Sequence, residues 1–150
     1  MDLMEGKIGY EAELNDWVNR EKSAVDLLNS VGKLMYENGV ELVFFRNHLV
    51  DTTITEMLQL FDYAKMVVHK PIDVHTTASI AKEMLNMDLP PSKIDIGKLT
   101  SEYLADKAAS KSISGFINTT LKDIVGRDKH AFEPKDVVLY GFGRIGRLAA

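Results

Sequence analysis

A glycine-rich turn near the end of the printed sequence constrains the fold of this chain more than any other feature. The segment DVVLYGFGRIGRLAA, residues 136–150, places Gly141, Gly143 and Gly146 in a G-x-G-x-x-G spacing directly after a short apolar run. Between a strand and a helix, this spacing is typical of a dinucleotide site, because the glycines allow a tight turn and a close approach of the backbone to a pyrophosphate. Amides at the start of the helix then face the anion.

The segment contains only the beginning of such a site. An acidic residue that binds the adenosine ribose is expected about 20 residues further on, and the sequence of 150 residues does not reach that position. A parallel strand also needs neighbours to satisfy its backbone amides and carbonyls. We therefore interpret residues 131–150 as the truncated first strand-turn-helix of a Rossmann NAD-binding domain, and the chain as a fragment of a larger enzyme.

The preceding residues have mainly helical patterns. Apolar side chains recur at helical spacing between Tyr10 and Asn38, and Gly39 is suited to end that helix. The run VELVFFRNHLVD, residues 40–51, fits either a short strand or a buried helical segment. The apolar positions in the first helix are Leu14, Trp17, Val18, Val25, Leu28, Val31, Leu34 and Met35.

Four further helices are indicated after residue 51. A capping box of Thr53 and Glu56 begins the first of them, and Pro71 ends it. The second carries Ile80, Ala81, Met84 and Leu85 and stops before Pro90-Pro91; the third is capped by Asp95; the fourth lies within residues 112–126 and ends at Gly126. The polar tract 127–135 resembles a linker. The sequence thus predicts a mainly α fold, with a helical N-terminal extension over residues 1–130.

Composition excludes several functional classes. The absence of cysteine rules out disulfides, thiolate metal sites and a cysteine nucleophile within this chain. A net charge of −4 argues against a nucleic-acid partner held by a basic surface. No apolar run reaches the length of a membrane span, and the acidic N-terminus lacks the features of a signal peptide. These features favour a cytoplasmic protein.

The segment GFGRIGR, residues 141–147, resembles the N-terminal signature of glyceraldehyde-3-phosphate dehydrogenases. ELVFFRN, PPSKIDIGKLTSEY and EPKDVVLYGFGRIGRL are similar to N-terminal stretches of the long-form bacterial branch of that family. The resemblance implies that the parent enzyme oxidises an aldehyde with NAD and phosphate in glycolysis. It also implies a small-molecule substrate and a homo-oligomer, with neither nucleic acid nor membrane as a partner.

The resemblance assigns cofactor contacts residue by residue. The backbone amides of Arg144 and Ile145 would contact the NAD pyrophosphate, and Gly141, Gly143 and Gly146 would shape the loop. Tyr140 stands where the short forms have asparagine. The catalytic cysteine and histidine of the family belong to the later half of the full enzyme, so no catalytic residue is assigned here, and the isolated chain is expected to be inactive.

Other polar and sulfur side chains have structural interpretations. His48, His69, His75 and His130 lack the spacing of a metal pair on one helix, and we expect solvated or capping histidines and no metal site. Asp62, Asp73, Asp88 and Asp95 are explained by helix caps and solvated faces. Met57, Met66, Met84 and Met87 are expected in the helical core.

Two alternative functions remain open. D-2-hydroxyacid dehydrogenases carry a similar glycine loop after about this length of chain, although a parallel α/β domain precedes it there. Alternatively, the helical region is an interaction or regulatory module without activity of its own. Such a module would expose a contiguous apolar patch.

Overall fold

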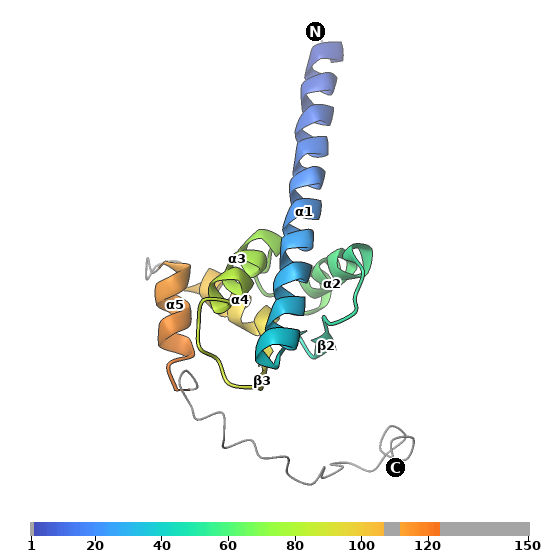
Figure 1. Ribbon diagram of the computed structural model, residues 1–150. Coiled ribbons are helices and arrows are strands. Elements are labelled where there is room, and N and C mark those ends of the chain that lie inside the picture. Colours follow the sequence, from blue (N-terminus) through green and yellow to red (C-terminus); the bar gives the residue numbers. More distant parts are fainter. Residues whose placement is uncertain (1, 107–111, 124–150) are drawn as a thin grey trace.

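The computed structural model describes residues 2–106 and 112–123, and this part is mainly helical with a small three-stranded sheet (Figure 1). A long first helix runs past the body of the molecule, and the shorter helices and the sheet gather around its C-terminal half (Figure 1). In chain order the elements are α1 (Asp2–Asn38), β1 (Val40–Phe44), β2 (Asn47–His48), α2 (Ile54–Val67), α3 (Val74–Met84), β3 (Ser92–Asp95), α4 (Ile96–Ala105) and α5 (Ile113–Thr120).

The sheet has the order β2-β1-β3. The ambiguous run after Gly39 is a strand: β1 pairs antiparallel with β2, with Val43 opposite His48. β1 also pairs parallel with β3, with Val40 opposite Ser92. β3 was not predicted, because its four residues are too few to show a period and their pairing partner lies far away in the chain.

A tight turn joins β1 to β2. Phe45 and Arg46 both have positive φ, 45° and 73°, the backbone pattern of a two-residue hairpin turn that usually contains asparagine or glycine. The side-chain amide of Asn47 donates to the carbonyl oxygen of Phe44 at 3.2 Å, and the backbone amide of Phe45 donates to Asp95 Oδ1 at 3.0 Å. Side chains on both sides therefore hold a turn that its own residues disfavour.

Local capping signals predicted the starts of α2 and α4 correctly. Thr53 and Glu56 form the capping box of α2, and Asp95 accepts a hydrogen bond from the Lys98 amide at the start of α4. Asp73 caps α3 in the same way, through the Thr76 amide. In the last helix the cap residue is Leu121, earlier than the predicted end; Gly126 lies outside the described residues.

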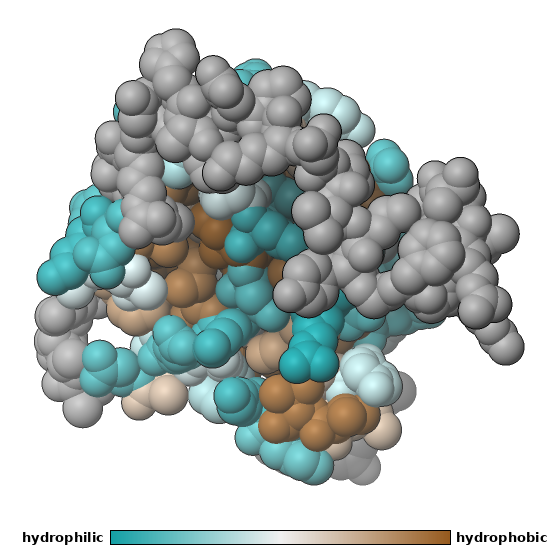
Figure 2. All heavy atoms as spheres, turned by 90° about the horizontal axis from the view of Figure 1, so that it is seen from below, coloured by the Kyte–Doolittle hydropathy of each residue, from teal (hydrophilic) through white to brown (hydrophobic). Residues whose placement is uncertain are grey.

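The core lies between the C-terminal half of α1, the sheet and the helices that follow. The ring of Phe44 on β1 lies 4.4 Å from that of Phe61 on α2, centroid to centroid. Thr77 on α3 and Thr100 on α4 share a buried hydrogen bond of 3.0 Å between their hydroxyls. Seen from below, hydrophobic atoms also show on the surface between hydrophilic ones (Figure 2). The largest fully buried side chains are Phe44, Phe61, Leu27, Leu34, Leu42, Leu49, Met57, Ile80, Met84, Leu89, Ile96 and Ile117.

The methionine prediction is confirmed in three of four cases. Met57 and Met84 are fully buried, and Met87 packs against the core. Met66 is 75% exposed, so its placement in the core is wrong. It lies near the end of α2, where Ala64 occupies the buried position instead.

Gly39 provides a direct test of how α1 ends. Its φ is +69°, and a Cβ atom there would lie 3.2 Å from Pro91 Cβ. We expect Gly39→Ala to lower the free energy of unfolding by about 1–2 kcal/mol, because a left-handed backbone costs that much with a side chain. Urea unfolding followed by circular dichroism measures the change. Gly39→Asn should cost less, since asparagine tolerates this region; equal losses for the two variants would contradict the explanation.

Candidate functional site: an apolar groove on the first helix

The residues predicted to bind the cofactor, Gly141, Gly143, Arg144, Ile145 and Gly146, lie outside the described residues. The same holds for Tyr140, His130 and the boundary proposed between residues 130 and 131. The assignment of these residues to NAD therefore stays a prediction from the sequence.

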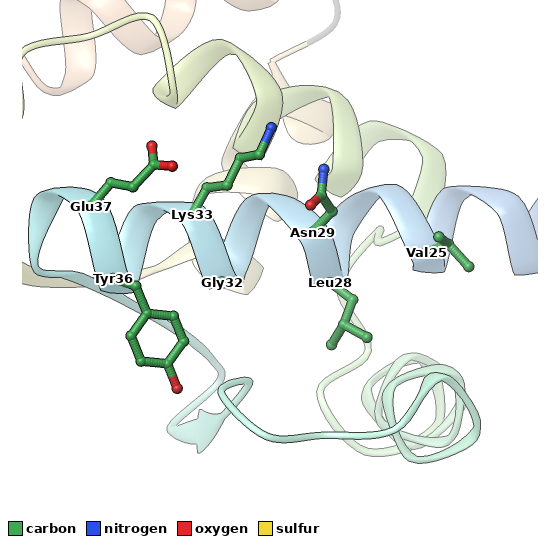
Figure 3. A pocket seen from close by; sticks show the side chains of 7 residues that line it. All are labelled: Val25, Leu28, Asn29, Gly32, Lys33, Tyr36 and Glu37. Atoms are coloured by element: carbon green, nitrogen blue, oxygen red, sulfur yellow. The ribbon is translucent and has the colours of Figure 1, made fainter.

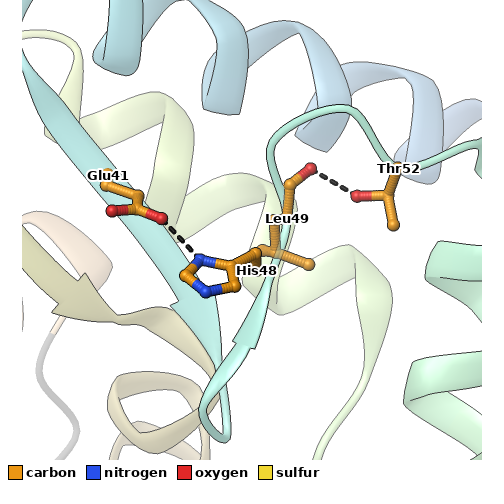
Figure 4. Close-up of polar contacts among 4 residues, drawn as sticks. All are labelled: Glu41, His48, Leu49 and Thr52. Atoms are coloured by element: carbon orange, nitrogen blue, oxygen red, sulfur yellow. Dashed lines mark hydrogen bonds and ion pairs between the residues drawn. The ribbon is translucent and has the colours of Figure 1, made fainter. Parts of the chain in front are cut away.

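His48, His69 and His75, the histidines among the described residues, are exposed, as predicted, and two of them connect elements. His48 Nδ1 on β2 lies 2.6 Å from Glu41 Oε1 on β1 (Figure 4). The same view shows the Thr52 hydroxyl donating to the carbonyl oxygen of Leu49, beyond β2. Ser23 Oγ on α1 lies 2.6 Å from His75 Nδ1 on α3. Sequence spacing gave no signal for either partner, because each comes from another element.

A small polar hollow lies where α1, α2 and the start of α3 meet. It measures about 190 Å³, and its walls include Asp16, Arg20, Lys65 and Asp73. Arg20 already forms an ion pair of 3.1 Å with Asp62, and Asp73 caps α3. The negative charges of the two aspartates are matched by the positive charges of Arg20 and Lys65. In the described part, no buried side-chain nitrogen or oxygen lacks a hydrogen-bond partner. The hollow is explained by the packing of three helices.

Residues 2–106 and 112–123 contain no group of three histidine, aspartate or glutamate side chains arranged to hold a metal ion. Within the same ranges, no helix is long and apolar enough to cross a membrane, and this includes α1 with its 37 residues.

An apolar groove runs along α1 in the described part of the chain. Two hollows of about 390 and 570 Å³ share Val25 and together extend from Trp17 to Glu37. In Figure 3, Leu28 and Tyr36 point to one side of the helix axis and Asn29, Lys33 and Glu37 to the other, with Gly32 between them. We call this feature the α1 groove. Its floor is apolar and its rim is polar, which is the usual composition of an interaction surface.

The structure shows which of the periodic apolar residues of α1 are buried. The side of α1 that packs into the core carries Ala24, Leu27, Ser30, Val31 and Leu34. The helix itself is confirmed and begins earlier than expected, at Asp2. The pattern did not separate the two sides, because apolar residues occur on both. Leu14, Trp17 and Val25 belong to the outer side and are 45%, 56% and 48% exposed.

The sequence was compared with known proteins, and no protein-family model matches it. It is 32% identical over 123 residues to a glyceraldehyde-3-phosphate dehydrogenase-like protein of Pseudomonas aeruginosa (strain UCBPP-PA14). The match covers 80% of this chain and 26% of that protein, so the chain spans about a quarter of its relative. The similarity supports a relation to part of a glyceraldehyde-3-phosphate dehydrogenase-like protein.

The length of the match shows which part of the chain is similar. Residues 124–150, which contain the glycine motif, make up 27 of the 150 positions. A match over 123 residues therefore lies mainly on the helical part. The sequence similarity therefore extends over the helical part and is not confined to the glycine motif.

Proposed function

We propose that this chain is the N-terminal part of an NAD-dependent glyceraldehyde-3-phosphate dehydrogenase of the long form. The observation that carries the proposal is the similarity to a dehydrogenase-like protein over most of the helical part. The G-x-G-x-x-G spacing at residues 141–146 supports it independently, because it follows an apolar run as the first strand of a Rossmann domain does. Residues 1–130 then form a helical extension, and residues 131–150 begin the NAD-binding domain.

Under this proposal each residue of the turn has a distinct part in binding. Gly141 allows the chain to reverse, Gly143 lets the backbone approach the pyrophosphate, and Gly146 lets the helix pack against the strand. The amides of Arg144 and Ile145 donate to the pyrophosphate oxygens. The bound NAD accepts hydride from the substrate. The nucleophile of the family is a cysteine, which this chain lacks, so it belongs to the remainder of the enzyme.

The remaining expectations concern the whole enzyme. We propose a phosphorylated aldehyde as its small-molecule substrate, a homo-oligomeric assembly, a cytoplasmic location and a place in glycolysis. Neither nucleic acid nor membrane is proposed as a partner. The net charge of −4 supports the first of these exclusions.

The isolated chain is expected to be inactive. We predict no NADH formation when the purified 150-residue chain is mixed with NAD, phosphate and glyceraldehyde 3-phosphate. The reasons are the missing nucleophile and the missing strands of the parallel sheet. Absorbance of NADH measures the reaction, with a complete glyceraldehyde-3-phosphate dehydrogenase as the positive control. Turnover by the chain alone would contradict the prediction.

The gene sequence beyond the codon for Ala150 tests the identity of the parent. We expect an open frame with an acidic residue after the second strand, and a cysteine followed by threonine and asparagine. In the polypeptide so encoded, Gly143→Val should weaken NAD binding, because a side chain blocks the approach of the pyrophosphate. Gly9→Ala, at an exposed site with nothing within 4 Å of the added atom, is the control. A stop codon directly after Ala150 would overturn the proposal.

The structure disfavours one of the two alternative functions and favours the other. The D-2-hydroxyacid dehydrogenase reading expects a parallel α/β domain before the glycine loop, whereas the described part is mainly helical with a three-stranded sheet. An interaction module is favoured by the exposed α1 groove. An interaction module is compatible with the proposed dehydrogenase, since one protein can have both an interaction surface and a catalytic activity.

A further inference from the structure

Asn38 is the only asparagine of this sequence that glycine follows. In such a pair the backbone nitrogen of the glycine approaches the side-chain amide of the asparagine with the least hindrance, because glycine has no Cβ atom. The pair is therefore the place in this chain where an asparagine most readily loses its side-chain nitrogen to attack by the backbone. The asparagines are Asn15, Asn19, Asn29, Asn38, Asn47, Asn86 and Asn118.

The pair forms the junction between α1 and β1. Asn38 is the last residue of α1 and is half-buried, whereas Gly39 is exposed. Gly39 has a φ of 69°, and its backbone amide donates to the carbonyl oxygen of Met35 at 3.1 Å. A glycine in this conformation commonly ends a helix. Within the described part of the chain, no hydrogen bond holds the side-chain amide of Asn38, so its restraint comes from the backbone.

The chain at the start of β3 holds the same junction from the other side. The Ser92 backbone amide donates to the carbonyl oxygen of Gly39 at 3.3 Å. The ring of Pro91 lies against Gly39, since a Cβ atom added there would lie 3.2 Å from Pro91 Cβ. The residue after Gly39, Val40, is fully buried and pairs with Ser92. The junction is thus tied to α1 and to β3 at once.

The closed junction keeps the reacting atoms apart. In an α-helix ψ is about −42°, and the side chain leans toward the N-terminal end of the helix. The Cγ atom of Asn38 therefore points away from the backbone nitrogen of Gly39, and that nitrogen is already engaged with Met35. Attack requires that the last turn of α1 opens and that Gly39 separates from Pro91 and Ser92.

We propose that Asn38 is a site of spontaneous deamidation whose rate is set by opening of this junction. In the open state the Gly39 nitrogen loses its proton to hydroxide and attacks Asn38 Cγ. The bond from Cγ to the side-chain nitrogen breaks, and this nitrogen takes up a proton and leaves as ammonia. Water then adds to one of the two carbonyl groups of the resulting succinimide ring and opens it, to aspartate or to isoaspartate. The inference does not depend on the proposed cofactor site.

Either product weakens the end of α1. Aspartate adds a negative charge beside Glu37, in a last turn without a basic residue, and negative charge at the C-terminus of a helix opposes the helix dipole. Isoaspartate in addition lengthens the backbone between residue 38 and Gly39. Leu34 and Val40 are fully buried on the two sides of this point, so the longer backbone disturbs their places in the core.

Peptide mapping of the 150-residue chain measures the reaction at this residue alone. Trypsin cleaves after Lys33 and Arg46, and the peptide between them, LMYENGVELVFFR, contains no asparagine or glutamine besides Asn38. At mildly alkaline pH we expect deamidated peptide to accumulate in the folded chain, at a rate at least roughly tenfold below that of the chain unfolded in guanidinium chloride. Asn38→Gln, with its longer side chain, should stop the reaction. No deamidated peptide, or equal rates in the folded and unfolded chains, would overturn the proposal.

Two proline variants test whether the junction sets the rate. Pro91→Gly removes the ring that lies against Gly39 and should raise the rate in the folded chain roughly threefold. Pro71→Gly, at an exposed position between α2 and α3, is the matched control. It gives the unfolded chain the same added freedom and should leave the rate in the folded chain nearly unchanged. Equal rates for the two variants would show that opening of the junction does not control the reaction.

Discussion

Alanine in place of Phe44 is expected to lower the free energy of unfolding by about 3–5 kcal/mol. The side chain is 1% exposed, and its ring lies 4.4 Å from that of Phe61 on α2 and 5.0 Å from that of Phe45. On α4, a Cβ atom at Gly97 would lie 2.9 Å from Phe44 Cδ2, so this ring already fills the space between β1 and α4. Removing it leaves a cavity that three elements border.

The loss would be a large part of the stability of a small domain, which is about 5–15 kcal/mol in total. Chemical unfolding measured by circular dichroism gives the change. Tyr63→Ala on α2 removes an aromatic ring that is 57% exposed, and it serves as the control with an expected change below about 1 kcal/mol. A loss of less than 1 kcal/mol for Phe44→Ala would show that the core does not close around this ring.

A double-mutant cycle measures the contact between the rings of Phe44 and Phe61 directly. Phe61 is also 1% exposed, so Phe61→Ala should be costly by itself. We expect the double variant to lose less than the two single losses combined, with a coupling of about 0.5–1.5 kcal/mol from the aromatic contact. Additive losses would mean that the two rings do not act on each other.

The parts of the fold that the sequence predicted well are those encoded by neighbouring residues. A capping box needs only Thr53 and Glu56, and the caps at Asp73 and Asp95 each need a side chain and an amide three residues later. The end of α1 at Gly39 also follows from one residue with an unusual backbone. Such signals do not depend on what the rest of the chain does.

The parts that were missed depend on residues far apart in the chain. β3 exists because Ile94 and its neighbours pair with Leu42 and its neighbours on β1, and four residues by themselves give no sign of that partner. Which residues of α1 are buried was not predicted either, for a similar reason. Its two apolar sides have comparable spacing, and only the positions of α3 and β1 decide that Leu27 is buried and Trp17 exposed.

Of the two candidate sites, one was predicted from neighbouring residues and the other was not predicted. The cofactor turn was predicted from the local glycine spacing at Gly141, Gly143 and Gly146, which lie outside the described residues. The α1 groove was not predicted, although the sequence contained its residues, because an apolar helical stripe is expected to face the core. The signal that would have found it is the length of the amphipathic pattern, which extends from Tyr10 to Tyr36, further than the core of a small domain requires.

Removal of the Asp95 carboxylate is expected to lower the free energy of unfolding by about 2–4 kcal/mol, as the combined loss of a helix cap and of a hydrogen bond to a partly buried amide. One oxygen, Oδ1, accepts from the Lys98 amide and from the Phe45 amide, each at 3.0 Å. The side chain therefore joins the first turn of α4 to the hairpin turn in which Phe45 and Arg46 have positive φ. In Asp95→Ala both amides lose their acceptor, and the hairpin turn loses one of its restraints.

Two matched variants separate these contributions in chemical unfolding experiments. Asp95→Asn keeps an acceptor at the same position and should lose much less than Asp95→Ala. Asp73→Ala removes a cap that bonds only within its own helix, through the Thr76 amide and hydroxyl, and should cost about 0.5–2 kcal/mol. If Asp95→Ala costs no more than Asp73→Ala, the bond to Phe45 contributes nothing, and the hairpin turn is held by Asn47 and the ladder alone.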